Sequence, residues 1–132
     1  MNASFLDTNI VVYCFSDDDD KRRKALAILA TKPVISAQVL NECANILKRK
    51  LNFKLEEIIV VINRLIQECH VVPLSAEITK AALTITERYG FSIYDSLIIA
   101  AALSANCTTL FSEDMQNQQI IDDKLTIINP FK

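Results

Sequence analysis

The chain has 132 residues, a formal net charge of -2 at pH 7 and a hydrophobic fraction of 51%. This length predicts one domain spanning residues 1–132, which buries about two-thirds of its unfolded surface. No apolar run approaches the roughly 18 residues that a membrane-spanning helix needs. The N-terminus also lacks the basic start and long apolar core of a secretory signal, so we expect a cytoplasmic protein without a membrane segment.

The first half of the chain alternates between strand and helix patterns. In chain order we expect a strand at 3–6, a short helix at 10–15, a helix capped by Ser16 or Asp17, a strand at 33–35 and a helix capped by Ser36. The second helix begins with acidic residues followed by basic ones, an order that suits the helix dipole. In the helix after Ser36, apolar residues recur at helical spacing.

The second half continues the alternation. We expect a helix at 55–69, a strand at 70–72, a helix from the Ser75 cap to about Tyr89, a helix at 93–105, a strand at 108–111, a loop with a short helix at 114–121 and a strand at 125–128. The expected inward face of the helix at 55–69 consists of Ile58, Ile59, Ile62, Leu65 and Ile66. Strands separated by helices predict an α/β fold, a three-layer α/β/α sandwich around a mostly parallel sheet.

Glycine, histidine and cysteine usage excludes several kinds of site. The single glycine, Gly90, excludes the P-loop and the dinucleotide-binding turn, which need more glycines. The single histidine, His70, lies beside apolar residues, so we expect it in the core or at a strand edge rather than as a general base. The cysteines lack a C-x-x-C pair and are expected to be reduced core residues: Cys14, Cys43, Cys69 and Cys107. Catalysis by this chain must therefore use carboxylates.

Acidic residues occur where predicted strands end or helices begin, at Asp7, Glu42, Asp95 and Asp114. In an open α/β sheet, ligands collect outside the carboxyl ends of the strands, so we expect these side chains to converge there. Carboxylates brought together repel one another unless protons or cations neutralise them. Mg²⁺ prefers oxygen ligands and keeps several waters. The pattern predicts a metal site that is assembled by folding.

Each acid also has a structural explanation. Asp95 follows Ser92 at the spacing of a capping box, Asp7 could form an Asx turn, and Asp114 could cap the segment after it. Glu42 could pair with a lysine or arginine. These explanations do not account for four acids at one edge of the sheet, so we favour the metal site.

Four motifs occur in order along the chain: Asp7-Thr8-Asn9, Glu42 on the third helix, Tyr94-Asp95-Ser96 with the apolar stretch after it, and Ser112-Glu113-Asp114. With these motifs the sequence resembles the PIN-domain ribonucleases over essentially its whole length. The short length and the motif spacing resemble the VapC-type toxins of type II toxin-antitoxin pairs.

The resemblance implies a role for each motif residue. The catalytic ligands of Mg²⁺ or Mn²⁺ would be Asp7, Glu42, Asp95 and Asp114. Residues that orient ligands or water would be Thr8, Asn9 and Ser112. Glu113 departs from the commonest family pattern, so either Glu113 or Asp114 could be the last ligand; Asp114 matches the motif position.

These features predict a metal-dependent endoribonuclease, in which a metal-bound water attacks the phosphodiester and leaves a 5′-phosphate and a 3′-hydroxyl. The resemblance implies a toxin that acts on structured RNA such as tRNA or rRNA, a small antitoxin that occludes the site, and a homodimer. The net charge of -2 is not the basic footprint of a nucleic-acid binder. Local basic groups must then contact phosphates, and the candidates are Lys48, Arg49 and Lys50, followed by Lys21, Arg22, Arg23 and Lys24.

Two other functions are considered. A non-catalytic PIN module would bind RNA or protein without cleavage, and the presence of all four acids disfavours it. A phosphatase or phosphoacceptor domain would need a second acid two residues from Asp7, or an acid pair with a lysine after a late strand. The motif Asp7-Thr8-Asn9 provides neither.

Overall fold

The computed structural model describes residues 3–132, and six strands in this part of the chain form one sheet of order β3-β2-β1-β4-β6-β5. The strands are β1 (Ala3–Leu6), β2 (Val34–Ser36), β3 (His70–Val72), β4 (Cys107–Phe111), β5 (Ile120–Ile121) and β6 (Leu125–Ile128). All neighbouring pairs run parallel except β5 and β6, which are antiparallel. The sheet is mostly parallel, as the sequence predicts.

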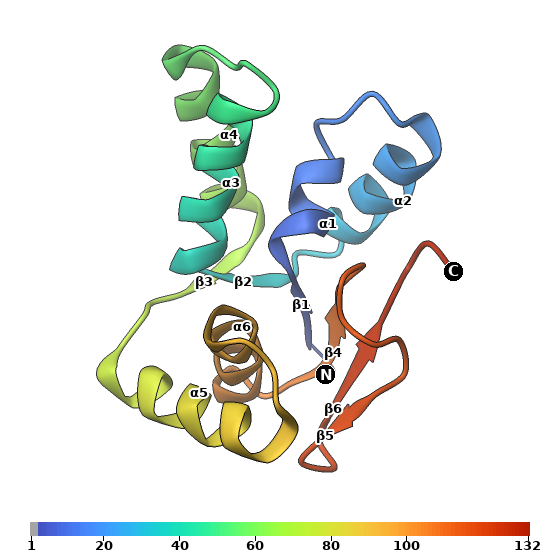
Figure 1. Ribbon diagram of the computed structural model, residues 1–132. Coiled ribbons are helices and arrows are strands. Elements are labelled where there is room, and N and C mark those ends of the chain that lie inside the picture. The colour runs from blue at the N-terminus through green and yellow to red at the C-terminus, as the bar shows by residue number, and fades with distance from the viewer. Residues whose placement is uncertain (1–2) are drawn as a thin grey trace.

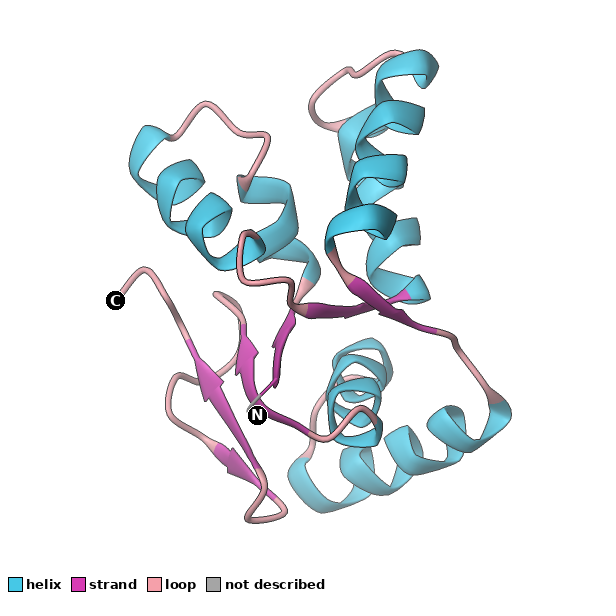
Figure 2. Cartoon of the chain, turned by 180° about the vertical axis from the view of Figure 1, so that it is seen from behind, coloured by secondary structure: helices cyan, strands magenta, loops and turns pink. Residues whose placement is uncertain are grey.

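Helices cover both faces of the sheet. They are α1 (Thr8–Tyr13), α2 (Asp19–Leu29), α3 (Ala37–Arg49), α4 (Leu55–Glu68), α5 (Ala76–Tyr89) and α6 (Ile93–Ser104). Figures 1 and 2 show α5 and α6 together on one side of the sheet and α1 to α4 on the other. The predicted three-layer α/β/α fold is therefore confirmed.

Side-chain caps set where several helices begin. The hydroxyls of Ser36 and Ser92 accept hydrogen bonds from backbone amides in the first turns of α3 and α6. Asp18 caps α2 by accepting from the amide of Lys21, so the prediction of a Ser16 or Asp17 cap was wrong by a residue or two. Serine and aspartate are both good N-cap residues, so the residue type does not decide among Ser16, Asp17 and Asp18. Asp18 is the cap because its carboxylate accepts from the amide of Lys21, the third residue of α2.

The core lies between the sheet and the two helix layers. In α6, the apolar segment Ile98 to Ala102 is buried, as its uniform hydrophobicity predicts. The helix α5 ends at Gly90, whose φ of 81° is the left-handed conformation that glycine adopts without a steric penalty. No helix in residues 3–132 is long and apolar enough to cross a membrane.

The buried face of α4 differs from the prediction. Ile58 and Leu65 are buried, but Val61 joins them, while Ile59 and Ile66 are 52% and 51% exposed. The buried residues of α4 are thus spaced i, i+3, i+7, whereas the predicted face also included Ile59, Ile62 and Ile66. The helix packs on α3 and touches β3, so a narrow stripe is sufficient to cover its buried side.

The segment 114–121 contains a strand instead of the predicted short helix. Ile120–Ile121 forms β5, in which Ile121 is fully buried and pairs with Leu125 of β6. The connecting turn has φ angles of 52° at Asp122 and 57° at Asp123, and the amide of Lys124 donates to the carbonyl of Ile121. Positive φ at both central residues of this turn from Ile121 to Lys124 is typical of the turns that connect hairpin strands, and aspartate tolerates it.

The cysteines and the histidine lie where the sequence places them. All four cysteines are free, three of them are buried and Cys69 is partly buried. Burial raises the pKa of Cys14 and Cys43 to about 12, so both thiols are neutral. His70 is exposed on β3, an edge strand of the sheet, which is the strand-edge position rather than the core.

Candidate metal centre

Asp7 follows β1 and caps α1. Its Oδ1 accepts a hydrogen bond of 2.7 Å from the amide of Thr8, and its Oδ2 accepts one of 2.8 Å from the hydroxyl of Ser112. The residue is 7% exposed. Burial raises the pKa of Asp7 to about 6; the hydrogen bonds from Ser112 and Thr8 oppose this rise, and the charges of Asp95 and Glu42 add to it. Asp7 therefore caps α1 and also lines the cleft, so its structural role does not exclude a role as a metal ligand.

Glu42 is held by two neutral side chains. The hydroxyl of Thr8 donates to its Oε1 at 2.6 Å, and the amide of Gln38 donates to its Oε2 at 3.4 Å. The same amide donates to the carbonyl of Tyr94 at 3.2 Å, next to Asp95. No lysine or arginine within residues 3–132 forms an ion pair with Glu42, so the alternative of a structural ion pair is not observed there.

Asp95 lies in the first turn of α6, where its amide donates to the Ser92 hydroxyl at 3.1 Å. Burial is the largest cause that raises the pKa of Asp95 above its ordinary value, and the charges of Asp114 and Glu42 add to it. Folding therefore brings these carboxylates, which come from distant parts of the chain, close enough for their charges to affect the pKa of Asp95.

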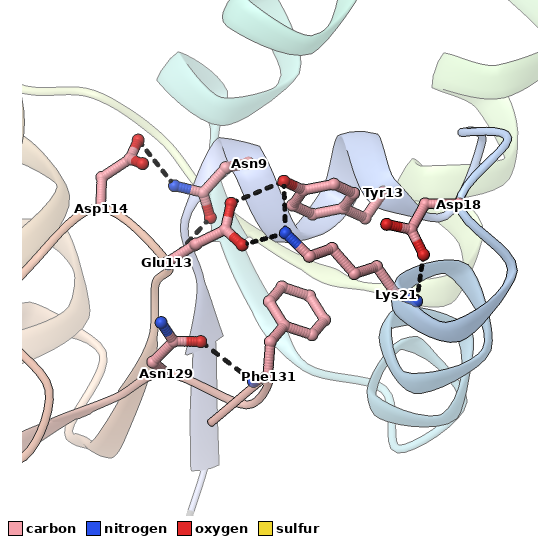
Figure 3. Close-up of polar contacts among 8 residues, drawn as sticks. All are labelled: Asn9, Tyr13, Asp18, Lys21, Glu113, Asp114, Asn129 and Phe131. Carbon is pink, nitrogen blue, oxygen red and sulfur yellow. Dashed lines mark hydrogen bonds and ion pairs between the residues drawn. The ribbon is translucent and has the colours of Figure 1, made fainter.

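Asp114 and Glu113 point in different directions after β4 (Figure 3). Asn9 donates from Nδ2 to Asp114 Oδ2 at 3.0 Å, and its Oδ1 accepts from the amide of Glu113 at 3.2 Å. The carboxylate of Glu113 instead contacts Tyr13 and Lys21. Asp114 lines the cleft, whereas Glu113 does not.

A cleft of about 630 Å³ lies at the carboxyl ends of the strands, and all four predicted acids line it. Its other lining residues are Thr8, Asn9, Val12, Tyr13, Ser16, Asn45, Ile46, Lys50 and Leu51. Folding therefore brings together acids from four separate segments. Lys50 lines this cleft, whereas Lys48 and Arg49 do not.

The donor set fits a hard divalent cation, because the acids and their neighbours offer oxygen ligands. In residues 3–132, however, no three Asp, Glu, Cys or His side chains lie close enough to hold an ion as they are arranged. The carboxylates of Glu42 and Asp114 are turned toward Thr8 and Asn9.

Sequence reasoning missed Gln38 and Tyr13 next to the acids, and it named Lys21 only as a candidate phosphate contact. Gln38 lies one helical turn before Glu42, a spacing that could have indicated it. Tyr13 lies one turn after Asn9 and could have been found in the same way. Lys21 gave no local signal, because its contact with Glu113 crosses 92 positions of sequence.

Comparisons with known proteins find solved structures with a similar fold. Similar solved structures include a toxin-antitoxin complex from Klebsiella pneumoniae, with 18% identity, a TM-score of 0.73, and coverage of 97% of this chain and 98% of that chain. VapC20 of Mycobacterium tuberculosis, a sarcin-ricin loop cleaving toxin, has 20% identity, a TM-score of 0.69, and coverage of 85% and 92%. VapBC2 of Rickettsia felis, bound to a DNA fragment from its promoter, has 26% identity, a TM-score of 0.68, and coverage of 95% and 96%.

A comparison with curated proteins gives no match. Residues 4–121 match the family model described as the PIN domain, which is most of the chain. The chain therefore belongs to the PIN domain family.

Proposed function

We propose that this chain is a metal-dependent endoribonuclease and the toxin of a type II toxin-antitoxin pair. The observation that carries the proposal is the convergence of Asp7, Glu42, Asp95 and Asp114 on one cleft at the carboxyl edge of the sheet. Membership of the PIN domain family supports a nuclease, and the similar toxin structures support the toxin role.

The four acids would hold Mg²⁺ or Mn²⁺. When bound, such a cation lowers the pKa of a coordinated water and stabilises negative charge on a phosphate. The chain contributes a fixed central ligand, since Thr8 and Ser112 orient both oxygens of Asp7. Because Asp7 is buried and its pKa is raised, a nearby positive charge is electrostatically favoured.

The substrate would be structured RNA, such as tRNA or rRNA, with Lys50 at the cleft contacting a phosphate. Hydrolysis by water would leave a 5′-phosphate and a 3′-hydroxyl. Lys21 is less suited to bind RNA than the sequence suggested, because Glu113 already engages its ammonium group.

A small antitoxin would cover the cleft, and a second copy of the chain would complete a homodimer. Large apolar side chains exposed on and beside α4 support a protein partner. These side chains are Leu51, Leu55, Ile59, Val60 and Ile66. Leu51 also lines the cleft, which connects this apolar surface with the candidate metal centre.

The decisive experiment uses the full chain purified without a partner. Total RNA is incubated with the wild type, with Asp7→Asn, and with Asp123→Asn, an exposed acid outside the cleft. We expect cleavage that requires Mn²⁺ or Mg²⁺, is lost in Asp7→Asn, is retained in Asp123→Asn, and produces 5′-phosphate ends.

Equal cleavage by the wild type and Asp7→Asn would indicate a contaminating nuclease and overturn the proposal. RNA binding without cleavage by any of the three proteins would favour the non-catalytic PIN module instead.

A further inference from the structure

Two side chains hold the carboxylate of Glu113, the residue that precedes Asp114. Glu113 Oε1 accepts a hydrogen bond of 2.6 Å from the hydroxyl of Tyr13, and Oε2 lies 2.5 Å from Lys21 Nζ. Lys21 Nζ also donates to the Tyr13 hydroxyl at 3.2 Å, which closes a triangle (Figure 3). We call Tyr13, Lys21 and Glu113 the Glu113 clamp.

Aromatic packing reinforces the Glu113 clamp. Lys21 Nζ lies 4.7 Å from the centroid of the Tyr13 ring and 5.3 Å from that of Phe131. The two rings meet edge to face at 5.1 Å. The clamp therefore joins α1, α2, the loop after β4 and the C-terminal segment around one partly buried ion pair.

The clamp acts on the same loop that carries Asp114. One turn before Tyr13, Asn9 binds the backbone amide of Glu113 and the carboxylate of Asp114. The helix α1 thus contacts the loop at Glu113 on both backbone and side chain and at Asp114 on its side chain. Glu113 extends toward Lys21, whereas the side chain of Asp114 points in another direction (Figure 3) and lines the cleft.

We propose that Lys21, Tyr13 and Glu113 are positioning residues, which fix the loop after β4 so that Asp114 faces the candidate metal centre. This inference rests on the proposed metal-dependent function. A substitution in the clamp would leave all four acids in the sequence, but it would let the loop that carries Asp114 move and would free the carboxylate of Glu113 beside it. Metal affinity should then fall without loss of the chemistry.

A second cluster in the chain provides a matched control. Arg88 Nη1 lies 2.5 Å from Asp122 Oδ1, and the hydroxyl of Tyr89 donates to the same oxygen at 3.0 Å. Like the Glu113 clamp, this cluster joins a helix to a loop through a basic side chain, a carboxylate and a tyrosine. None of its residues lines the cleft.

The test measures the dissociation constant for Mn²⁺ by titration calorimetry on the wild type, Lys21→Met, Arg88→Met and Asp114→Asn. Residues that orient metal ligands typically affect affinity by 10- to 100-fold, so we expect Lys21→Met to weaken Mn²⁺ binding about 10-fold. Arg88→Met should stay within about twofold of the wild type, and Asp114→Asn should lose more than about 100-fold.

Two further readouts separate positioning from general stability. Saturating Mn²⁺ should restore RNA cleavage by Lys21→Met, because all four acids remain. Hydrogen exchange at the amides of Glu113 and Met115 should be faster in Lys21→Met and unchanged in Arg88→Met. Circular dichroism verifies folding, and Tyr13→Phe, which keeps the ring, replaces Lys21→Met if the latter does not fold.

The outcomes distinguish the two proposals. If the wild type does not bind Mn²⁺, the metal-dependent function is wrong, and the clamp inference fails with it. If the wild type binds Mn²⁺ and Asp114→Asn does not, but Lys21→Met behaves like Arg88→Met, the metal site stands and the clamp is only structural.

Discussion

Two clusters within residues 3–132 combine a basic side chain, a tyrosine and a carboxylate, and one of the two adjoins the cleft. In the Glu113 clamp, Lys21 and Tyr13 hold a carboxylate that immediately precedes Asp114. In the other cluster, Arg88 and Tyr89 hold Asp122 in the turn between β5 and β6. Both clusters hold a carboxylate with a basic group and a tyrosine hydroxyl, so we expect any functional difference to come from where that carboxylate lies relative to the cleft.

The acids of the clusters also differ from the acids of the cleft. Burial alone would raise the pKa of Glu113, but hydrogen bonds from Lys21 and Tyr13 outweigh it and hold that pKa below its ordinary value. Asp7 has neutral donors only, and its pKa is raised to about 6. Cations thus compensate the acids that hold the structure together, whereas neutral groups orient Asp7 and leave its charge uncompensated.

The largest expected difference between the two regions is in catalysis. Asp114→Asn removes a proposed ligand and should reduce the rate of Mn²⁺-dependent RNA cleavage by more than about 100-fold, beyond the usual effect of residues that only support a ligand. Asp122→Asn makes the same chemical change in the other cluster and should stay within about twofold. Initial rates at a fixed Mn²⁺ concentration measure both. A comparable loss in Asp122→Asn would mean that the two regions are not functionally distinct.

The fold and the position of the four acids at the strand ends could be predicted from the sequence. Asp7 and Asp114 follow strands, Asp95 opens a buried helix, and the alternation of elements predicts where parallel strands end. Because these are local signals combined with a general property of α/β sheets, the fold and the meeting of the four acids at one cleft could be predicted. The helix caps Ser36, Ser75 and Ser92 and the helix end at Gly90 could also be predicted, because they depend only on neighbouring residues.

Other features depend on tertiary contacts. Tyr13 meets Glu113 across 100 positions, so no local pattern shows which of Glu113 and Asp114 faces the cleft. The strand β5 has only two residues, too few for a period-two pattern to identify it. On α4, several apolar residues compete for the buried face, and packing on α3 decides among them.

The second prediction concerns the free energy of unfolding without metal. Replacing an acid of the cleft should raise it, whereas replacing the acid held by Arg88 and Tyr89 should lower it. The pKa of Asp7 is about 6 in the folded chain and has an ordinary value of 3.8, so the folded state binds the proton more tightly. Its favourable contribution is present at pH 4 and is lost as pH rises through 6. In EDTA at pH 7.5, Asp7→Asn should raise the free energy of unfolding by about 1 to 3 kcal/mol.

Asp122→Asn should instead lower that free energy by up to about 1 kcal/mol, because it breaks a partly exposed ion pair. Urea denaturation at pH 4 and pH 7.5 measures both variants. A destabilising effect of Asp7→Asn that is equal at the two pH values would show that its hydrogen bonds, rather than its ionisation, dominate.

The third prediction is that the two tyrosines make similar contributions to stability. Tyr13→Phe and Tyr89→Phe each remove a hydroxyl that donates to a carboxylate and leave the ring in place. Each should lower the free energy of unfolding by about 1.5 kcal/mol, the lower end of the net value for a hydrogen bond to a charged group, because both tyrosines are partly exposed. Thermal unfolding of the two variants is the measurement. A much larger loss for Tyr13→Phe would mean that the Glu113 clamp is primarily a stability element.

The smallest effect is expected from single lysines that contact RNA. Lys50 lines the cleft, whereas Lys124, exposed after the β5–β6 turn, does not. In the background of Asp114→Asn, which should bind RNA without cleaving it, Lys50→Ala should reduce the slope of log affinity against log salt concentration by about 0.7 to 1, since one phosphate contact is lost. Lys124→Ala should leave the slope unchanged. If both variants have the same slope as the parent, Lys50 does not contact an RNA phosphate. The phosphate contacts must then lie elsewhere, and the exposed Arg23 and Lys24 on α2 are the next residues to substitute.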